Sequence, residues 1–408
     1  MNNIPFFRLI FFCFALMGIF FTAVRPVLAD EVNENASPGA MEQQLDTTFS
    51  ERPLSPPAPP AYSRGKVVLI LDEKEVEIDG QKTFTQRVQV KLLSGDEKGT
   101  TVTLDHGGEY IIKGQQKVRK GERVVVASAE NGGKQEYFII DQYRLPALLW
   151  IFLAFVALAV YFGGKRGITS LIGLVISIFI LGKYIVPNIV SGTNPFLVGL
   201  VGAVIIALIA LYVAHGFNKR TTIALASTLI TIGLAALLSI AFVTFAKLFG
   251  TGSEDALYAQ TGMLQNLDLR GLLLAGILIG TLGVLDDVTT GQTAAVEEIQ
   301  KANGTLSMRE LYARGLSVGR EHIASLVNTL ALAYAGASLP LFLLFATNQT
   351  QPLWVIGNSE AIADEVVRTL VGSSALILAV PIATILAAYF FRAQSKSAAP
   401  VHNEKNNA

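Results

Sequence analysis

Long apolar runs dominate the chain from Leu145 onward, and short polar stretches separate them. Each run is close to the roughly 20 apolar residues that a helix needs to cross a bilayer. The pattern therefore predicts an α-helical polytopic membrane protein with about seven transmembrane helices in a domain at 143–391. We expect these helices at 145–162, 167–187, 195–217, 221–249, 267–288, 323–346 and 367–391.

Apolar and polar residues alternate with a period of two between residues 63 and 142. This alternation predicts a small, exported, all-β domain, a barrel or a sandwich, in front of the helices. The basic strand Arg87–Lys91 is interpreted as having a solvated face. Turns are expected at Asp79-Gly80, Ser94-Gly95 and Gly107-Gly108. The expected strands are Lys66–Leu71, Glu75–Ile78, Phe84–Leu93, Thr100–Leu104, Glu109–Ile112, Arg123–Ala127 and Glu136–Ile140.

The first 62 residues contain two segments of different character. Arg8, the apolar stretch Leu9–Val24 and the small-residue site Val27-Leu28-Ala29 predict a signal peptide at 1–29, with an uncleaved anchor helix as the alternative. Residues 30–62 are acidic and rich in proline, so we expect a disordered, extended linker. Both alternatives for 1–29 place the β domain outside the cytoplasm.

The composition excludes several classes of protein. With 51% hydrophobic residues, 16% charged residues and a mean hydropathy of +0.47, the chain does not fit a soluble enzyme. The single cysteine, Cys13, leaves no disulfide framework or cysteine-based metal site within one chain. The four histidines are scattered, and the sequence lacks P-loop, H-E-x-x-H and G-x-S-x-G motifs. We therefore predict no cofactor, no metal site and no enzymatic activity.

Basic residues gather in alternate connections between the apolar runs, and this distribution predicts the orientation. If the β domain is exported, most of these bases lie on the cytoplasmic side of a bacterial plasma membrane, and the tail 392–408 is cytoplasmic. Four bases fall at outer ends: Lys183, Lys247, Arg270 and Arg368. The inner bases are Lys165, Arg166, Lys219, Arg220, Lys301, Arg309, Arg314, Arg320, Arg392, Lys396 and Lys405.

The fifth run carries the first candidate site. Asp286, Thr290 and Glu297 share one helical face, and Asp287 adjoins Asp286. If the helix begins near Gly271, the acidic pair lies within the apolar slab and indicates a proton or cation relay. If the helix begins near Leu267, the pair lies at the inner interface, and the acids are merely solvated.

A second polar stripe leads into the sixth run. Arg314, Glu321 and Asn328 share one helical face, and His322 flanks it. We expect Arg314 and Glu321 to face Asp286 or Glu297 across a helical hairpin, and Pro340 to kink the sixth helix. Asn328 is interpreted first as a hydrogen-bonding contact between helices. The candidate pathway residues are Asp286, Asp287, Thr290, Glu297, Arg314, Glu321, His322 and Asn328.

The stretch Gly280–Thr289, followed by Glu297-Glu298, resembles the signature region of the YibE/F-like family of bacterial membrane proteins. Glu365–Ser373 with Ala379–Ile382 resembles the same family in the last apolar run. The resemblance covers most of residues 65–391. It implies a polytopic plasma-membrane protein and names no biochemical activity.

The leading functional hypothesis is a transporter or permease, with coupling to protons or cations left open. Its partners would be the lipid bilayer and a small-molecule or ion substrate that the sequence does not identify. The alternative is a membrane scaffold or sensor whose β domain binds a partner in the cell envelope. An intramembrane enzyme ranks third, because no catalytic set accompanies the carboxylates. Nucleic acid is not expected as a partner, because an exported β domain without an aromatic stacking platform does not suit it.

Overall fold

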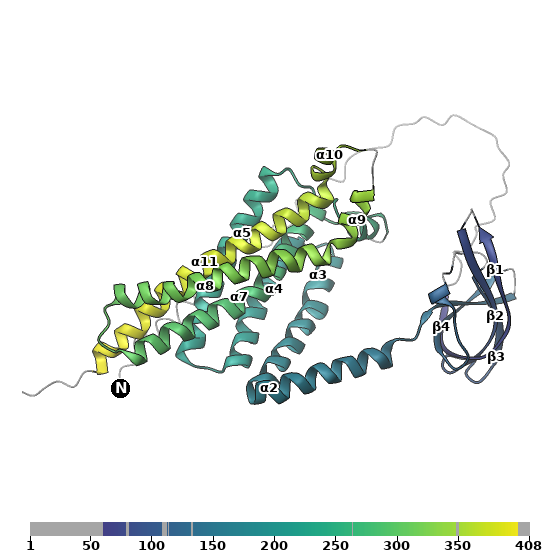
Figure 1. Cartoon of the computed structure of the whole chain (residues 1–408), viewed down its shortest axis with the longest axis horizontal. Coiled ribbons are helices and arrows are strands. Elements are labelled where there is room, and N and C mark those ends of the chain that lie inside the picture. The colour runs from purple at the N-terminus through teal and green to yellow at the C-terminus, as the bar shows by residue number, and fades with distance from the viewer. Residues whose placement is uncertain are drawn as a thin grey trace, which may run out of the picture. The chain divides into compact units, whose positions relative to one another are not determined.

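A computed structural model describes residues 60–78, 81–107, 112, 114–131, 134–262, 264–347 and 351–398. The described chain forms two compact units, one built from β-strands and one from helices, and they divide within the first long helix, between Ala157 and Leu158 (Figure 1). The predicted signal peptide, nearly all of the predicted linker, and the end of the predicted tail lie outside the described residues.

The β unit is one antiparallel sheet with the strand order β3-β2-β1-β4-β5, curled into a half-barrel. Two expected strands are a single strand, β1, which bulges between Val67 and Leu69 and again between Ile70 and Asp72. Ile112, the described residue of the expected strand 109–112, is not in a strand. The strands are β1 (Ala61–Ile78), β2 (Gln81–Leu92), β3 (Thr101–His106), β4 (Arg123–Asn131) and β5 (Lys134–Gln142), with a 3-10 turn at Gly114–Gln116.

The alternation in β2 sorts its side chains as the sequence predicts. Val88 and Val90 are fully buried in the apolar core of the half-barrel, whereas Arg87 and Lys91 are exposed. The basic strand therefore does present a solvated face.

Two polar side chains inside the half-barrel anchor the segment that follows β3. Thr83 Oγ1 accepts a hydrogen bond from Ile112 N (2.8 Å) and lies 3.2 Å from Ile112 O. Gln86 Oε1 accepts from Val118 N (2.8 Å), and Gln86 Nε2 donates to Val118 O (3.2 Å) and to Glu73 (2.9 Å). These bonds satisfy backbone groups of a segment that is not itself part of the sheet.

The helical unit contains the apolar runs. In the described part of the chain, five helices are long and apolar enough to cross a membrane, or six if α8 and α9 form one span bent by 60°. Its elements are α2 (Leu145–Ile180), a π-helical turn η2 (Leu181–Ile185), α3 (Val186–Val190), α4 (Pro195–His215), α5 (Lys219–Phe245), α6 (Glu254–Thr261), α7 (Leu269–Ala302), α8 (Met308–Ala337), α9 (Leu339–Thr347), α10 (Leu353–Gly357) and α11 (Glu360–Ala398).

The expected count of seven spans differs from this finding for a local reason. The first two expected spans lie in one continuous apolar stretch of 46 residues, Leu145–Val190. Within it, Gly164 has φ 55° and ψ −135°, which breaks the helix and which residues other than glycine rarely adopt. The kink expected at Pro340 is confirmed, because the bend between α8 and α9 lies immediately before it.

Helix α7 is central to the helical unit and packs against α4, α5, α8 and α11 (Figure 1). Close approach depends on glycines: a Cβ at Gly199 would lie 2.6 Å from Ala275, and one at Gly319 would lie 2.3 Å from Val380. A Cβ at Gly280 would lie 2.7 Å from the hydroxyl of Tyr334 on α8, so this glycine leaves room for that side chain.

Polar bonds also connect the buried helices. Thr228 and Thr289 join α5 to α7 through their hydroxyl groups at 2.7 Å. Gln292 Nε2 lies 2.8 Å from both Gly315 O and Thr384 Oγ1, so it connects α7 to α8 and α11. These contacts fix the orientation of α7.

Candidate functional site

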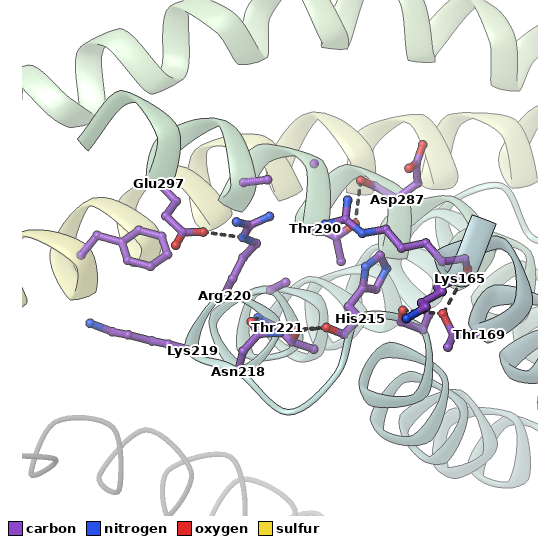
Figure 2. A pocket seen from close by; sticks show the side chains of 16 residues that line it. Lys165, Thr169, His215, Asn218, Lys219, Arg220, Thr221, Asp287, Thr290 and Glu297 are labelled. Carbon is purple, nitrogen blue, oxygen red and sulfur yellow. Dashed lines mark hydrogen bonds and ion pairs between the residues drawn. The ribbon is translucent and has the colours of Figure 1, made fainter. Parts of the chain in front are cut away.

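Two adjoining cavities lie along the face of α7 that carries the predicted acidic residues. The first, of about 770 Å³, is lined by residues from α2, from the connection between α4 and α5, and from α7 (Figure 2). The second, of about 490 Å³, extends from it between α2, α4 and α7. Both cavities share Ala214, His215, Asp287 and Thr290, and we call the combined space the groove.

The first cavity is the cationic end of the groove. Arg220 forms an ion pair with Glu297, whose other oxygen lies 3.2 Å from Lys301 Nζ. Lys165 and Arg166 line the same cavity and form no ion pair with any described residue. No carboxylate of the described chain therefore offsets the positive charge of these two side chains through a salt bridge.

The connection between α4 and α5 is shaped by its own hydrogen bonds. Gly216 takes a positive φ of 78°, and Asn218 caps α5 by accepting from Thr221 N (2.9 Å). Asn218 Nδ2 also donates to His215 O (2.8 Å), which fixes the end of α4 (Figure 2). Thr169 Oγ1 lies 3.0 Å from Ala214 O, so α2 is joined to the same point.

The acidic pair lies where the two cavities meet. Asp286 is half-buried, and its Oδ1 has no hydrogen-bond partner among the described residues. His215 is close enough to Asp286 to interact with it electrostatically, and in Figure 2 its ring lies beside Thr290. Thr290 Oγ1 donates to the backbone oxygen of Asp286 (2.8 Å). A carboxyl and an imidazole therefore share the junction of the groove.

The start of α7 decides how deep this junction lies. Asp268 caps the helix by accepting from Gly271 N (2.9 Å), and α7 begins at Leu269, between the two starting points considered from the sequence. At about 1.5 Å per residue, Asp286 lies roughly 26 Å from Leu269 along the helix. A hydrocarbon core is about 30 Å thick, so a span that entered the core at Leu269 would reach Asp286 before leaving it.

Residues 151–393 match the model of the YibE/F-like protein family, which is more than half of the chain. The chain belongs to the YibE/F-like family. The match contains every residue that lines the groove, whereas the five β-strands lie outside it, although the sequence resemblance was expected from residue 65. Searches of curated proteins and of solved structures find no significant match.

Four of the eight predicted site residues of this YibE/F-like protein come together. Asp286, Asp287 and Thr290 line the second cavity, and Asp287, Thr290 and Glu297 line the first. The other four are on exposed positions of α8 and line neither cavity: Arg314, Glu321, His322 and Asn328.

The expected pairing of α8 with the acids of α7 is not found among the described residues. Glu297 pairs with Arg220 of α5 instead of Arg314. The reason is steric, because α8 turns its glycine face inward. Gly315 lies against Val296 and Thr384, and Gly319 lies against Val380, so the polar stripe of α8 points away from α7.

Several groove residues of this family member were not predicted as site residues. Lys165, Arg166 and Arg220 were interpreted only as markers of orientation, and His215 was counted among scattered histidines. One signal in the sequence could have predicted them. These bases lie at the ends of apolar runs, and the acids of α7 also lie near the end of an apolar run. Arg368, one of the bases assigned to outer ends, lies 3.7 Å from Glu365 and beside Gly276.

Within the described parts of the chain, no group of three or more His, Cys, Asp or Glu residues is arranged to hold a metal ion. What the groove offers is one cationic end, one apolar end, and a carboxyl and an imidazole between them.

Proposed function

We propose that this chain is a transporter or permease of the bacterial plasma membrane, and that the groove is its substrate pathway. The observation that carries the proposal is the groove itself, which joins a charged cavity at one end of α7 to an apolar cavity along its length. A scaffold that only anchors a β domain has no need for such a space between its helices. Catalysis is not part of the proposal.

The coupling element in this proposal is the junction formed by Asp286, Asp287 and His215. An ionisable residue at membrane depth is costly and is retained mostly where it serves an ion or proton path. His215 suits proton exchange, because an imidazole changes charge near neutral pH. Asp286 Oδ1, which lacks a partner among the described residues, is the acceptor that a proton or cation would complete.

The proposed topology has seven spans, with the β domain outside and the C-terminus in the cytoplasm. The stretch Leu145–Val190 has 46 residues, which at about 1.5 Å per residue is roughly 69 Å and more than two bilayer cores. The helix break at Gly164, next to Lys165 and Arg166, supports dividing it into two spans. Those bases would then lie on the cytoplasmic side with Lys219 and Arg220.

Proton movement in liposomes tests the coupling. The purified chain is reconstituted with a pH-sensitive dye trapped inside, and a potassium diffusion potential drives protons inward. We expect the double variant Asp286→Asn, Asp287→Asn to lower the rate at least tenfold. Glu321→Gln is the matched control, because this exposed carboxylate of α8 lies outside the groove. Equal rates in the parent and the double variant would refute the coupling role.

A sensor or scaffold is the second candidate, because the β domain forms a compact unit with its own apolar core. If this is the function, deleting the β domain should have the same effect on the cell as deleting the whole protein. Proton movement in liposomes should then be unchanged. The transporter function predicts that the liposome activity follows Asp286 and Asp287.

A further inference from the structure

The two ends of the groove differ in chemistry in a way that constrains what it binds. One end is lined by the bases Lys165, Arg166, Lys219 and Arg220. The other end is lined mainly by aliphatic and small residues. A molecule that complements both ends has an anionic head and an apolar chain.

The cationic end has the features of a phosphate site. Of the two acids in this cavity, Glu297 is paired with Arg220 and Lys301, and Asp287 forms no ion pair with Lys165 or Arg166, so these two bases are available to a ligand. Helix α5 begins at this point, after its cap Asn218, and the start of a helix attracts anions. Arginine and lysine together recognise the oxygens of a phosphate group.

The apolar end has space for a hydrocarbon chain. A Cβ on Gly283, which lines this cavity, would meet no atom within 4 Å. Its wall on α2 includes Leu174 and Ile178, which are 43% and 59% exposed. The cavity therefore has an outer wall that itself faces the surroundings of the helical unit, where a membrane-embedded protein meets lipid.

We propose that the groove binds an anionic phospholipid, with the phosphate at Lys165, Arg166 and His215 and one acyl chain in the apolar cavity. The occupant follows from charge complementarity at one end and from the continuous apolar cavity at the other. The inference names a substrate class for the proposed transporter. That the lipid is transported rests on the proposed function, whereas binding of the lipid does not. A free phosphate ion would use the cationic end alone.

Native mass spectrometry of the purified, delipidated full-length chain measures this binding. The protein in detergent is titrated with phosphatidylglycerol, with phosphatidylcholine, and with inorganic phosphate in a separate series. We expect phosphatidylglycerol to bind at least tenfold more tightly than the other two. Arg166→Gln should weaken phosphatidylglycerol binding about tenfold, whereas Arg309→Gln, an exposed base of α8 outside the groove, should leave it unchanged.

A second pair of variants tests the apolar end without removing charge. Gly283→Leu fills the cavity, and we expect at least a tenfold loss of phosphatidylglycerol affinity. Gly233→Leu in α5 is the control, because a Cβ there also meets no atom within 4 Å and the residue lines neither cavity. Two results would overturn the inference: equal affinity in Gly283→Leu and the parent, or inorganic phosphate that binds as tightly as the lipid.

The failure of this inference and of the proposed function are distinguishable. If Gly283→Leu weakens lipid binding but the double variant Asp286→Asn, Asp287→Asn leaves proton movement unchanged, the inference is supported and the coupling role is refuted. Proton movement that depends on the aspartates, with lipid affinity unaffected by Gly283→Leu, refutes the inference alone.

Discussion

The two units of the chain differ in how completely their buried polar groups are hydrogen-bonded. In the half-barrel, Thr83 and Gln86 bond to backbone groups of Ile112 and Val118. In the helical unit, some polar atoms are buried without any partner among the described residues. All five such atoms in the described chain belong to the helical unit: Asp286 Oδ1, Gln300 Oε1, Ser359 Oγ, Asp364 Oδ1 and Arg368 Nε.

This difference separates polar groups that hold the fold from polar groups that do not. A buried polar atom without a partner costs about 1–3 kcal/mol, so it persists where something other than stability retains it. The half-barrel completes its polar contacts, and substitutions there should cost stability. Asp286 Oδ1 has no such contact among the described residues. Substitution of Asp286 should therefore lower the activity of the protein more than its stability.

The largest expected effect is at Gln86 in the half-barrel. Gln86→Leu leaves Val118 N and Val118 O unpaired, so we expect a loss of about 3 kcal/mol in the free energy of unfolding. Urea unfolding of a fragment 60–144, followed by far-ultraviolet circular dichroism, measures it. Gln89→Leu is the control, because Gln89 lies in the same strand at a half-buried position; equal losses would contradict the interpretation.

Thr83→Val gives a smaller effect of the same kind. Valine has nearly the shape of threonine but does not accept the hydrogen bond from Ile112 N, so we expect a loss of about 1–2 kcal/mol. The same urea experiment applies, with Thr85→Val, half-buried in the same strand, as the control. A tolerated Thr83→Val would show that the segment after β3 does not need this anchor.

Acid should weaken the half-barrel through Glu73. Hydrogen bonds from Lys117 (2.5 Å) and from Gln86 hold the pKa of Glu73 below its ordinary value of 4.5. Because the pKa is lower in the folded state, this contribution is complete above pH 4.5 and is lost as the pH falls through the folded pKa. We expect Glu73→Gln to flatten the pH dependence of urea unfolding below pH 4.5; an unchanged slope would contradict this.

The smallest stability effect is expected at Asp286. Since Asp286 Oδ1 has no hydrogen-bond partner among the described residues, Asp286→Asn should change the free energy of unfolding of the purified chain by less than about 1 kcal/mol. Thr228→Val, which removes the bond to Thr289, should cost about 1 kcal/mol or more. Thermal unfolding in detergent compares the two variants, and a larger loss for Asp286→Asn would remove the distinction between the two units.

Periodicity predicted which residues share a face, but not where that face points. Asp286, Thr290 and Glu297 on α7 do lie together along the groove. The stripe with Glu321 and Asn328 has similar spacing on α8 and is exposed. The direction of α8 is set by Gly315 and Gly319, whose contacts with α7 and α11 depend on tertiary packing.

Two further differences have local causes that hydropathy does not encode. The bulges in β1 join two expected strands into one, because a bulge changes the alternation without ending the strand. Ser359 is of a residue type that commonly caps helices, yet at the start of α11 its Oγ has no partner among the described residues. Glu360 instead accepts hydrogen bonds from Phe249 N (2.5 Å) and Thr251 N (3.1 Å).

The contacts between α2 and α4 have a consequence for how a ligand enters the groove and what sets its occupancy. Near the groove, α2 touches α4 through Thr169 and Ala214 and through Gly173 and Ala210, while Leu174 and Ile178 stay exposed. If the groove binds a phospholipid as proposed, this exposed wall lets the lipid enter by lateral diffusion within the membrane. Occupancy then depends on the mole fraction of the lipid in the surrounding leaflet, and diluting the protein in water leaves it unchanged.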